Sequence, residues 1–449
     1  MGPDFPAAPT NPRRHRSRIP AVHQTTGHHP NRHRIAVIGS GVAGLTAAYL
    51  LQRRHEVLLF EADPRLGGHA HTHDVPSAHG GTIGVDSGFI VHNERTYPTL
   101  LRLFGELGVR TRETEMSMSI RCDGCGLEYA GAKGVRGLFA QRRNATDHRY
   151  LRMLTEVKRF HRHAARLLQR EDAGDVGLGA FLAIGGYSRY FVDHFVLPLV
   201  STVWSADRTD TLKYPARYLF EFLRNHGMLT VKNSPAWRTV EGGSREYVEL
   251  AAKQLTAVHL STPVRSVRRT ARGIEIRDDA DTRHRVDRVV VATHADQALR
   301  LLADPTPAER EVLGAFRYSR NDAWLHTDTS VLPHADAARS GWNYRTPVCG
   351  AGSDAVQVSY DMNRLMRLDE PTGYVVTLNP RAEPDASSVV AKMTYEHPVY
   401  TPESVAAQRK LAALNDGVIA YAGAYHGWGF HEDGCSSGVR AAGSFGVGW

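Results

Sequence analysis

The 449-residue sequence predicts an α/β fold in which a parallel sheet is combined with a second, interleaved domain. Residues 35–38 are an apolar, β-branched run typical of a buried parallel strand, and an Ala/Leu-rich helical pattern follows at once. A second apolar run at 57–60 completes a strand–helix–strand unit. A chain of this length can bury a large core and is expected to divide into two domains.

Three glycines lie between the first strand and the helix, in the spacing G-x-G-x-x-G. Gly39 is expected to make the tight turn, Gly41 to let a diphosphate approach the backbone, and Gly44 to let the helix pack against the strand. The helix N-terminus then presents free N–H groups and the positive end of its dipole to the diphosphate. The contacts predicted for this turn are Gly39, Ser40, Gly41, Ala43 and Gly44.

An acidic residue, Glu61, ends the second predicted strand. It lies roughly twenty residues after the glycine turn, where a ribose-binding carboxylate is expected. A carboxylate there accepts hydrogen bonds from both ribose hydroxyls and repels a 2′-phosphate. The alternative is an ordinary strand–helix–strand unit with chance glycines. The combined pattern favours an adenine-dinucleotide site.

The residues after Glu61 distinguish FAD from NAD. Residues 61–69 resemble the Glu-x-x-x-Arg-x-Gly-Gly extension of flavoproteins in the amine oxidase and phytoene desaturase superfamily. Arg65 could pair with phosphate, and two glycines could let the backbone approach the ribityl chain or the flavin. A plain turn is the alternative reading. The pattern favours FAD over NAD, with predicted contacts from Glu61, Ala62, Arg65, Gly67, Gly68 and His69.

A second glycine-rich turn follows an apolar strand near the C-terminus. A helix is expected to start around Asp433, with its N-terminus aimed at the flavin pyrimidine, where negative charge develops on reduction. Superfamily members usually carry an acidic residue just after the strand glycine, but here that residue is Ala424, so Glu432 or a backbone group is expected to replace it. The contacts predicted here are Gly423, Phe430, Glu432, Asp433 and Gly434, and the strand at 259–267 adds Val264, a candidate backbone contact to adenine.

The net charge of +8 is concentrated near the N-terminus. Residues 1–34 contain six arginines and one acidic residue, and they are rich in Pro and His. This composition predicts a disordered basic tail at 1–32, and the lack of an apolar h-region argues against a secretory signal. The remaining chain is only weakly basic, which argues against nucleic-acid binding. A solvated tail without function is favoured over a contact with acidic lipid head groups.

Cysteine content and hydropathy bound the cellular setting. No run of eighteen apolar residues occurs, so no membrane-spanning segment is expected. The four cysteines do not suggest a disulfide framework. The expected location is the cytoplasm, either free in it or in peripheral contact with the membrane surface. Cys122 and Cys125 lack a second pair at zinc spacing, and the Asp-Gly between them is a hairpin signal. We therefore expect a turn rather than a redox dithiol, and no metal site.

The segments between these motifs predict the second domain. Helical spacing occurs at 96–108, 146–170 and 212–226, and residues 115–130 alternate like a hairpin. The aromatic helices of this second domain either pack as its core or line a hydrophobic substrate tunnel. Alternation near 315–330, 340–360 and 373–379 predicts an antiparallel sheet. The predicted boundaries are 33–95, 240–300 and 400–449 for the FAD-binding domain, and 96–239 and 301–399 for the substrate or cap domain.

Several longer motifs together resemble one branch of the superfamily, the bacterial predicted NAD/FAD-binding oxidoreductases associated with cyclopropane-fatty-acyl-phospholipid synthases. These motifs are residues 85–98, 204–206, 225–229, 237–248, 325–328, 360–365 and 423–434. The resemblance implies a Rossmann-like FAD-binding domain of the amine-oxidase type, interleaved with a substrate domain of antiparallel sheet plus helices. It also implies a modified fatty acyl chain as substrate and a lipid methyltransferase or cyclopropane synthase as partner.

Three functions are compatible with these patterns. The favoured one is an FAD-dependent oxidoreductase that dehydrogenates a hydrophobic substrate, such as a phospholipid acyl chain. The alternatives are a flavin amine oxidase and a non-catalytic flavin-binding partner of a lipid methyltransferase. Residues 318–325 contain no lysine of the kind that amine oxidases use near the flavin. FAD is expected to bind non-covalently, because no Cys or His lies in an attachment motif, and the preferred catalytic candidates are Tyr425 and His431.

Overall fold

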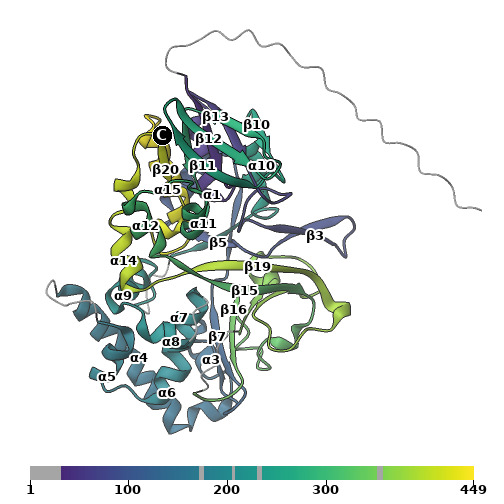
Figure 1. The fold of residues 1–449 in the computed structure, drawn as a ribbon. Coiled ribbons are helices and arrows are strands. Elements are labelled where there is room, and N and C mark those ends of the chain that lie inside the picture. The colour runs from purple at the N-terminus through teal and green to yellow at the C-terminus, as the bar shows by residue number, and fades with distance from the viewer. Residues whose placement is uncertain (1–31, 171–175, 205–207, 230–234, 351–356) are drawn as a thin grey trace, which may run out of the picture. The chain divides into compact units, whose positions relative to one another are not determined.

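The computed structural model describes residues 32–170, 176–204, 208–229, 235–350 and 357–449. A five-stranded parallel sheet holds together segments far apart in the sequence (Figure 1). Strand β1 lies in its centre and pairs with β2 on one side and β14 on the other. In spatial order the strands are β10 (Ala257–His259), β2 (Glu56–Phe60), β1 (Arg34–Ile38), β14 (Arg288–Val291) and β20 (Ile419–Tyr421). The predicted parallel sheet is confirmed.

Both faces of this sheet are covered, as the apolar runs predict for parallel strands. Successive side chains of a strand point to opposite faces, so Ile35 and Val37 pack into one core and Ala36 and Ile38 into another. The first core contains the helices α1 (Val42–Leu51), α2 (Pro98–Leu107), α10 (Arg245–Ala252) and α15 (His431–Ser444). The second contains the antiparallel strands β11 (Val264–Thr270), β12 (Gly273–Asp278) and β13 (Arg283–Val286), with α11 (Ala295–Leu301), α12 (Pro307–Gly314) and α14 (Pro402–Gln408).

A seven-stranded mixed sheet forms the second large layer. Its neighbours are antiparallel except β7 and β16, which run parallel. The segments predicted to form an antiparallel sheet, near 315–330, 340–360 and 373–379, pair antiparallel as β15 with β18, β18 with β17, and β17 with β16, so this prediction is confirmed. Strand β7, from the hairpin predicted at 115–130, adds a parallel neighbour on the other side of β16. The order is β19 (Val389–Val399), β15 (Arg317–His326), β18 (Val375–Leu378), β17 (Gln357–Asp361), β16 (Trp342–Thr346), β7 (Met118–Cys122) and β8 (Glu128–Tyr129).

A helical layer packs against one end of the mixed sheet around an aromatic core (Figure 1). The predicted long helix forms as α4 (His148–Gln169), and Asp147 caps it by accepting hydrogen bonds from two backbone N–H groups. The other helices of this layer are α3 (Gly134–Leu138), α5 (Leu178–Ile184), α6 (Arg189–Phe191), the π-helical turn η3 (Val192–Val196), α7 (Leu197–Trp204), α8 (Arg208–Lys213) and α9 (Ala216–Asn225).

Two small sheets connect these layers. The hairpin of β3 (Thr72–Pro76) and β4 (Thr82–Asp86) follows the turn after Glu61. The strands β5 (Val91–Asn93), β9 (Trp237–Val240) and β6 (Thr111–Thr114) form the other sheet, and the short helix α13 (Met362–Leu365) follows β17. No helix in the described residues is long and apolar enough to cross a membrane. The predicted tail at 1–32 lies outside the described residues except for Arg32, and the predicted domain boundaries remain predictions.

Candidate active site

A cavity of about 720 Å³ opens at the carboxyl ends of the parallel strands. It is bordered by the ends of β1, β14 and β20, where ligands bind in open α/β sheets. We call the part lined by residues 39–43, 61–63, 262–264 and 292–293, with Arg65 and Gly68, the nucleotide half. The strand ends and their turns supply this half, and three glycines and three alanines are among its residues, so much of its backbone is accessible.

The glycine turn places the N-terminus of α1 at the nucleotide half. Gly39 has a φ of +97° and donates its N–H to the Phe60 carbonyl over 2.8 Å, which holds the turn between β1 and α1 against the end of β2. Gly41 faces open space, because a Cβ added there meets no protein atom within 4 Å. No side chain caps α1 and its first turn carries no acidic residue. These uncapped N–H groups form an anion site that suits a diphosphate.

Two further residues of the glycine turn, Gly44 and Ser40, fix its packing and its hydrogen bonds. A Cβ on Gly44 would lie 1.9 Å from the Gly39 carbonyl oxygen, so only glycine lets α1 pack this close to the turn. Ser40 is buried, and its N–H and Oγ donate to Glu61 over 2.9 and 2.5 Å. Ser40, Gly41 and Ala43 line the cavity and Gly44 does not.

Glu61 sits at the end of β2 beside the glycine turn. Its second carboxylate oxygen accepts the Asp63 N–H at 2.9 Å, which points both oxygens into the turn region. Glu61, Ala62 and Val264 all line the cavity, the last from the start of β11. The structure therefore brings together the residues predicted for ribose and for adenine.

The predicted second bend lies against the first. Gly67 and Gly68 both have positive φ, +108° and +55°, and Gly67 donates its N–H to the Ser40 carbonyl over 3.1 Å. Arg65 donates to the Gly68 carbonyl over 2.8 Å, so its guanidinium also supports the bend. Arg65, Gly68 and His69 line the cavity, whereas Gly67 lies behind them. A phosphate contact from Arg65 remains a prediction.

The C-terminal turn separates cavity residues from supporting ones. Gly423, Phe430 and His431 line the cavity. Glu432 accepts the backbone N–H groups of Thr99 and Leu100 at 3.0 and 2.9 Å, so it caps helix α2 rather than facing the cavity. Its predicted role as a ribityl ligand therefore lacks support from the geometry.

Two neighbours of Glu432 hold helix α15 in place. Asp433 accepts the Phe430 N–H at 2.9 Å at the start of the helix, and burial raises the pKa of this carboxyl to about 7. A Cβ on Gly434 would lie 2.7 Å from Val42, so glycine there allows α15 to approach α1. Neither residue lines the cavity. Both act on the site through the position of the helix, and their predicted direct contacts are untested.

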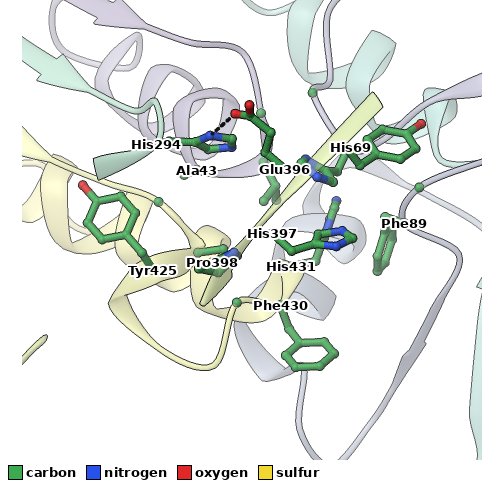
Figure 2. Close-up of a pocket in the computed structure, with 18 of the residues that line it drawn as sticks. Ala43, His69, Phe89, His294, Glu396, His397, Pro398, Tyr425, Phe430 and His431 are labelled. Carbon is green, nitrogen blue, oxygen red and sulfur yellow. Dashed lines mark ion pairs between the residues drawn. The ribbon is translucent and has the colours of Figure 1, made fainter. Parts of the chain in front are cut away.

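Four histidines surround the centre of the cavity (Figure 2). Burial lowers the pKa of His397 to about 4 and that of His431 to about 3, and it lowers the pKa of His69 well below its usual value. His294 lies 3.2 Å from the Glu396 carboxylate. Buried imidazoles with lowered pKa values are neutral near pH 7, so they can donate or accept hydrogen bonds without carrying charge into the cavity.

The two preferred catalytic candidates occupy separate positions. His431 stacks on Phe89 with ring centroids 3.7 Å apart, and its Nε2 lies 3.1 Å from the Tyr247 hydroxyl. Tyr425 lies on the other side of Pro398 in Figure 2. Its buried hydroxyl has no hydrogen-bond partner among the described residues, and its ring packs against Phe316. The structure thus lines the cavity with both residues without bringing them together.

Aromatic side chains from the mixed sheet and the helical layer line the rest of the cavity. Phe222 is central: its ring lies 4.6 Å from Trp204 and 5.0 Å from Phe430, centroid to centroid. We call this part the aromatic half; it consists of Tyr97, Met116, Trp204, Phe222, His226, Met228, Trp237, Trp342, Tyr360, Leu378, Tyr395, Trp428 and Phe430. Lysine is absent from the described residues that line the cavity.

Sequence reasoning missed the contribution of β14 and β19. Thr293, His294 and Gln297 line the cavity where β14 leads into α11, and Tyr395, Glu396 and His397 line it from β19. The first group follows a strand that the sequence predicts and that lies next to β1. Because ligands bind at the carboxyl ends of parallel strands, this position could have identified the group as part of the site. The second group lies within an alternating strand, and nothing local indicates which residues face the cavity.

Comparisons with known proteins agree with this geometry. The model of the flavin containing amine oxidoreductase family matches residues 42–359, more than half of the chain. The chain belongs to this family. It is therefore an FAD-dependent oxidoreductase, and the predicted FAD cofactor is confirmed. No curated protein matches the sequence of this flavin oxidoreductase at a significant level.

Solved structures share its fold at low sequence identity. The CLA-producing fatty acid isomerase from P. acnes is 17% identical with a TM-score of 0.61, covering 90% of this chain and 97% of that one. Cyclohexylamine oxidase from Brevibacterium oxydans IH-35A is 16% identical with a TM-score of 0.63, covering 92% and 98%. A putative protoporphyrinogen oxidase from Exiguobacterium sp. 255-15 is 17% identical with a TM-score of 0.63, also covering 92% and 98%. At this identity the similarity shows the fold.

The cavity suits FAD in this oxidoreductase. The uncapped end of α1 and the open space at Gly41 would hold the diphosphate, and Glu61 and Val264 lie where ribose and adenine would bind. When bound, FAD supplies a two-electron acceptor. The chain supplies the rest: orientation, exclusion of water by the aromatic half, and neutral imidazoles at the centre.

Proposed function

We propose that this flavin oxidoreductase dehydrogenates a hydrophobic substrate, such as a modified fatty acyl chain. The observation that carries the proposal is the aromatic half of the cavity, whose thirteen side chains are aromatic or apolar apart from His226. The charged lining residues, among them Glu396 beside His294, belong to the rest of the cavity. Apolar surface without charged partners favours burial of hydrocarbon. A long apolar chain would bind there by losing contact with water.

The chemistry of the cavity centre fits dehydrogenation. Removing two hydrogens from adjacent carbons transfers two electrons and one proton to the acceptor and releases a second proton. His69 lines the cavity, and its buried Nε2 has no hydrogen-bond partner among the described residues. Burial lowers the pKa of His69 well below its ordinary value, so its imidazole is neutral near pH 7. It can hydrogen-bond to a substrate or pass a proton on to another group, but it is too weak a base to hold that proton.

Amine oxidation is the second candidate, supported by the family itself. The cavity offers Tyr395, Tyr425 and Trp428 as aromatic surfaces for an amine. The absence of lysine from the described lining argues against the lysine-dependent form of this chemistry. The fold similarity to cyclohexylamine oxidase and to a fatty acid isomerase does not choose between the two substrates.

Anaerobic flavin reduction separates these functions. The purified FAD-loaded protein is mixed with phospholipid carrying methyl-branched or unsaturated chains, and loss of the oxidised flavin absorption is followed. We expect bleaching together with a mass loss of two hydrogens from the acyl chain. Straight saturated phospholipid is the matched control. Bleaching by mono- or polyamines alone would indicate an amine oxidase, and bleaching by neither would support the non-catalytic alternative.

We also propose a peripheral contact with an acidic membrane surface, which would give access to phospholipid chains. Helix α4 supports this, because its exposed positions carry Arg149, Arg152, Lys158, Arg162 and Arg166. Such a basic face is attracted to anionic head groups. Co-sedimentation with anionic vesicles but not with neutral ones is the expected result.

A lipid methyltransferase or cyclopropane synthase remains the proposed protein partner, tested by co-purification.

A further inference from the structure

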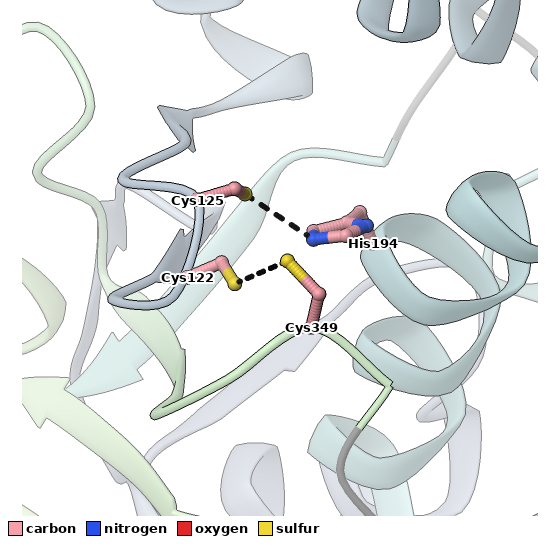
Figure 3. Close-up of side chains that lie close together, drawn as sticks. All are labelled: Cys122, Cys125, His194 and Cys349. Carbon is pink, nitrogen blue, oxygen red and sulfur yellow. Dashed lines mark hydrogen bonds between the residues drawn. The ribbon is translucent and has the colours of Figure 1, made fainter.

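Three cysteines and one histidine meet in the helical end of the molecule (Figure 3). Cys122 ends β7, Cys125 lies in the following turn, His194 is on η3, and Cys349 follows β16. Their four ligand atoms all lie within 4.8 Å of one another. The Sγ atoms of Cys122 and Cys349 are 3.6 Å apart, and the Cys125 Sγ lies 3.5 Å from the His194 Nε2.

Two of these separations match the edges of a tetrahedral zinc site, and the other four are at most 4.8 Å. Zinc binds thiolate sulfur at about 2.3 Å and imidazole nitrogen at about 2.0–2.1 Å, so the edges of the tetrahedron are about 3.8 Å between sulfurs and about 3.6 Å between sulfur and nitrogen. The two measured edges agree with these values. The Cys-x2-Cys spacing of Cys122 and Cys125 is also common in structural zinc sites.

The histidine is already in the tautomer that a metal needs. Its Nδ1 lies 3.0 Å from the Tyr190 carbonyl oxygen, which can only accept, so Nδ1 carries the proton. Nε2 is then unprotonated and faces Cys125. A backbone carbonyl that orients the second ring nitrogen is usual for metal-binding histidines. The π-helical turn that carries His194 is a form often found at functional positions.

Backbone packing holds the two cysteine-bearing loops together. A Cβ on Gly124 would lie 2.8 Å from the Val348 Cα and 3.0 Å from the Cys349 N, so glycine lets the turn approach the segment after β16. The Asp123 N–H also donates to the Thr346 carbonyl over 2.9 Å. The site is therefore assembled by the fold and does not depend on a mobile side chain reaching across a surface.

We propose that Cys122, Cys125, His194 and Cys349 bind one Zn²⁺ ion as a closed structural site. Three thiols lose their protons to solvent as three Zn–S bonds form, the neutral imidazole supplies the fourth bond, and no electron is transferred. Four protein ligands leave no open position for substrate. The ion would tie the β7 hairpin, the helical layer and the segment after β16 together.

The site is independent of the flavin chemistry, since none of its four residues lines the cavity. The sequence did not show it, because the Cys-x2-Cys pair lacks its partners locally: His194 and Cys349 lie about 70 and about 220 residues further on. A disulfide between Cys122 and Cys349 would leave Cys125 and His194 facing each other without a role, and all four cysteines are free in the structure.

Metal analysis of the full-length, FAD-loaded protein tests the proposal. Protein purified without an affinity metal column is expected to contain one zinc per chain, measured by mass spectrometry together with the FAD content. Cys125→Ser and His194→Ala should each lower the zinc content at least tenfold. Cys435→Ser is the matched control, because Cys435 is buried on α15 far from the cluster in sequence and is hydrogen-bonded to Thr46; its zinc content should be unchanged.

A measurement on the wild-type protein tests the proposal even when the variants fail to fold. Modification of thiols with a mercurial reagent should release one zinc per chain to a colorimetric chelator. Replacement of zinc by Co²⁺ should give the visible bands of a tetrahedral thiolate site, at wavelengths beyond the flavin absorption. FAD-loaded wild-type protein without zinc, without cobalt bands after reconstitution, or with a Cys122–Cys349 disulfide in peptide mass analysis would overturn the proposal.

Discussion

The nucleotide half of the cavity lies at strand ends and the glycine-containing turns that follow them, whereas the aromatic half consists mainly of large side chains from helices and the mixed sheet. Gly41 in the first half leaves space for a ligand, and Phe222 in the second fills space with an aromatic ring. The backbone N–H groups of the nucleotide half recognise the diphosphate of the cofactor. The side chains of the aromatic half set the size and polarity of the substrate that can enter. The difference implies that each half can be disrupted without the other.

The largest effect is expected from Gly41→Val in the nucleotide half. The backbone there has φ −61° and ψ 175°, which valine adopts, and the added atoms enter the open space at the end of α1. The protein should fold, but its FAD affinity should fall at least about 100-fold, or about 2.7 kcal/mol. Titration of the apoprotein with FAD, followed by fluorescence quenching, measures this.

Gly44→Ala is the matched control three residues away. Its Cβ would lie 1.9 Å from the Gly39 carbonyl, so it should lower the free energy of unfolding by about 1–3 kcal/mol through overpacking. Equal losses of FAD affinity and stability in both variants would show that the space at Gly41 is not a ligand site.

A charge placed in the aromatic half should affect substrate and not cofactor. Met228→Lys puts an ammonium group at a half-buried lining position. We expect kcat/KM for the lipid substrate to fall at least about tenfold, because an apolar chain cannot pair with the charge. FAD content should stay the same, and Met228→Leu should retain most of the activity. Loss of FAD in the lysine variant would contradict the division of the cavity.

The buried histidines predict that stability depends on pH. The pKa of His431 is lowered to about 3, so below about pH 6.5 the unfolded chain binds a proton there that the folded protein does not. Stability therefore falls with decreasing pH, by about 1.4 kcal/mol per pH unit for this residue. His431→Gln should lose about 2 kcal/mol less than wild type between pH 7 and pH 5, measured by guanidinium unfolding. Equal pH dependence would mean that His431 is not buried as a neutral group.

Tyr425→Phe should have the smallest effect. The hydroxyl has no partner among the described residues, and the ring packs in the core below the nucleotide half. Removing it should change the free energy of unfolding by less than about 0.5 kcal/mol, and kcat by less than about twofold. A fall in kcat with unchanged stability would instead assign Tyr425 the catalytic role that its position in the sequence suggests.

The sequence by itself determined the nucleotide half. Gly39, Gly41, Glu61 and the bend at Gly68 are local features, since each acts through the backbone conformation of its own turn next to a predictable strand. Such information lies within a few residues, so it can be read without knowing the fold. The parallel sheet and the FAD cofactor followed from it.

Only the tertiary structure decided the rest. It placed His294 and His397 at the cavity from strands separated by about a hundred residues, and it turned Glu432 toward the N-terminus of α2. It also brought His194 and Cys349 to the Cys122 turn. These groupings depend on which strands and helices become neighbours, and that pairing is fixed by burial of whole faces rather than by local sequence.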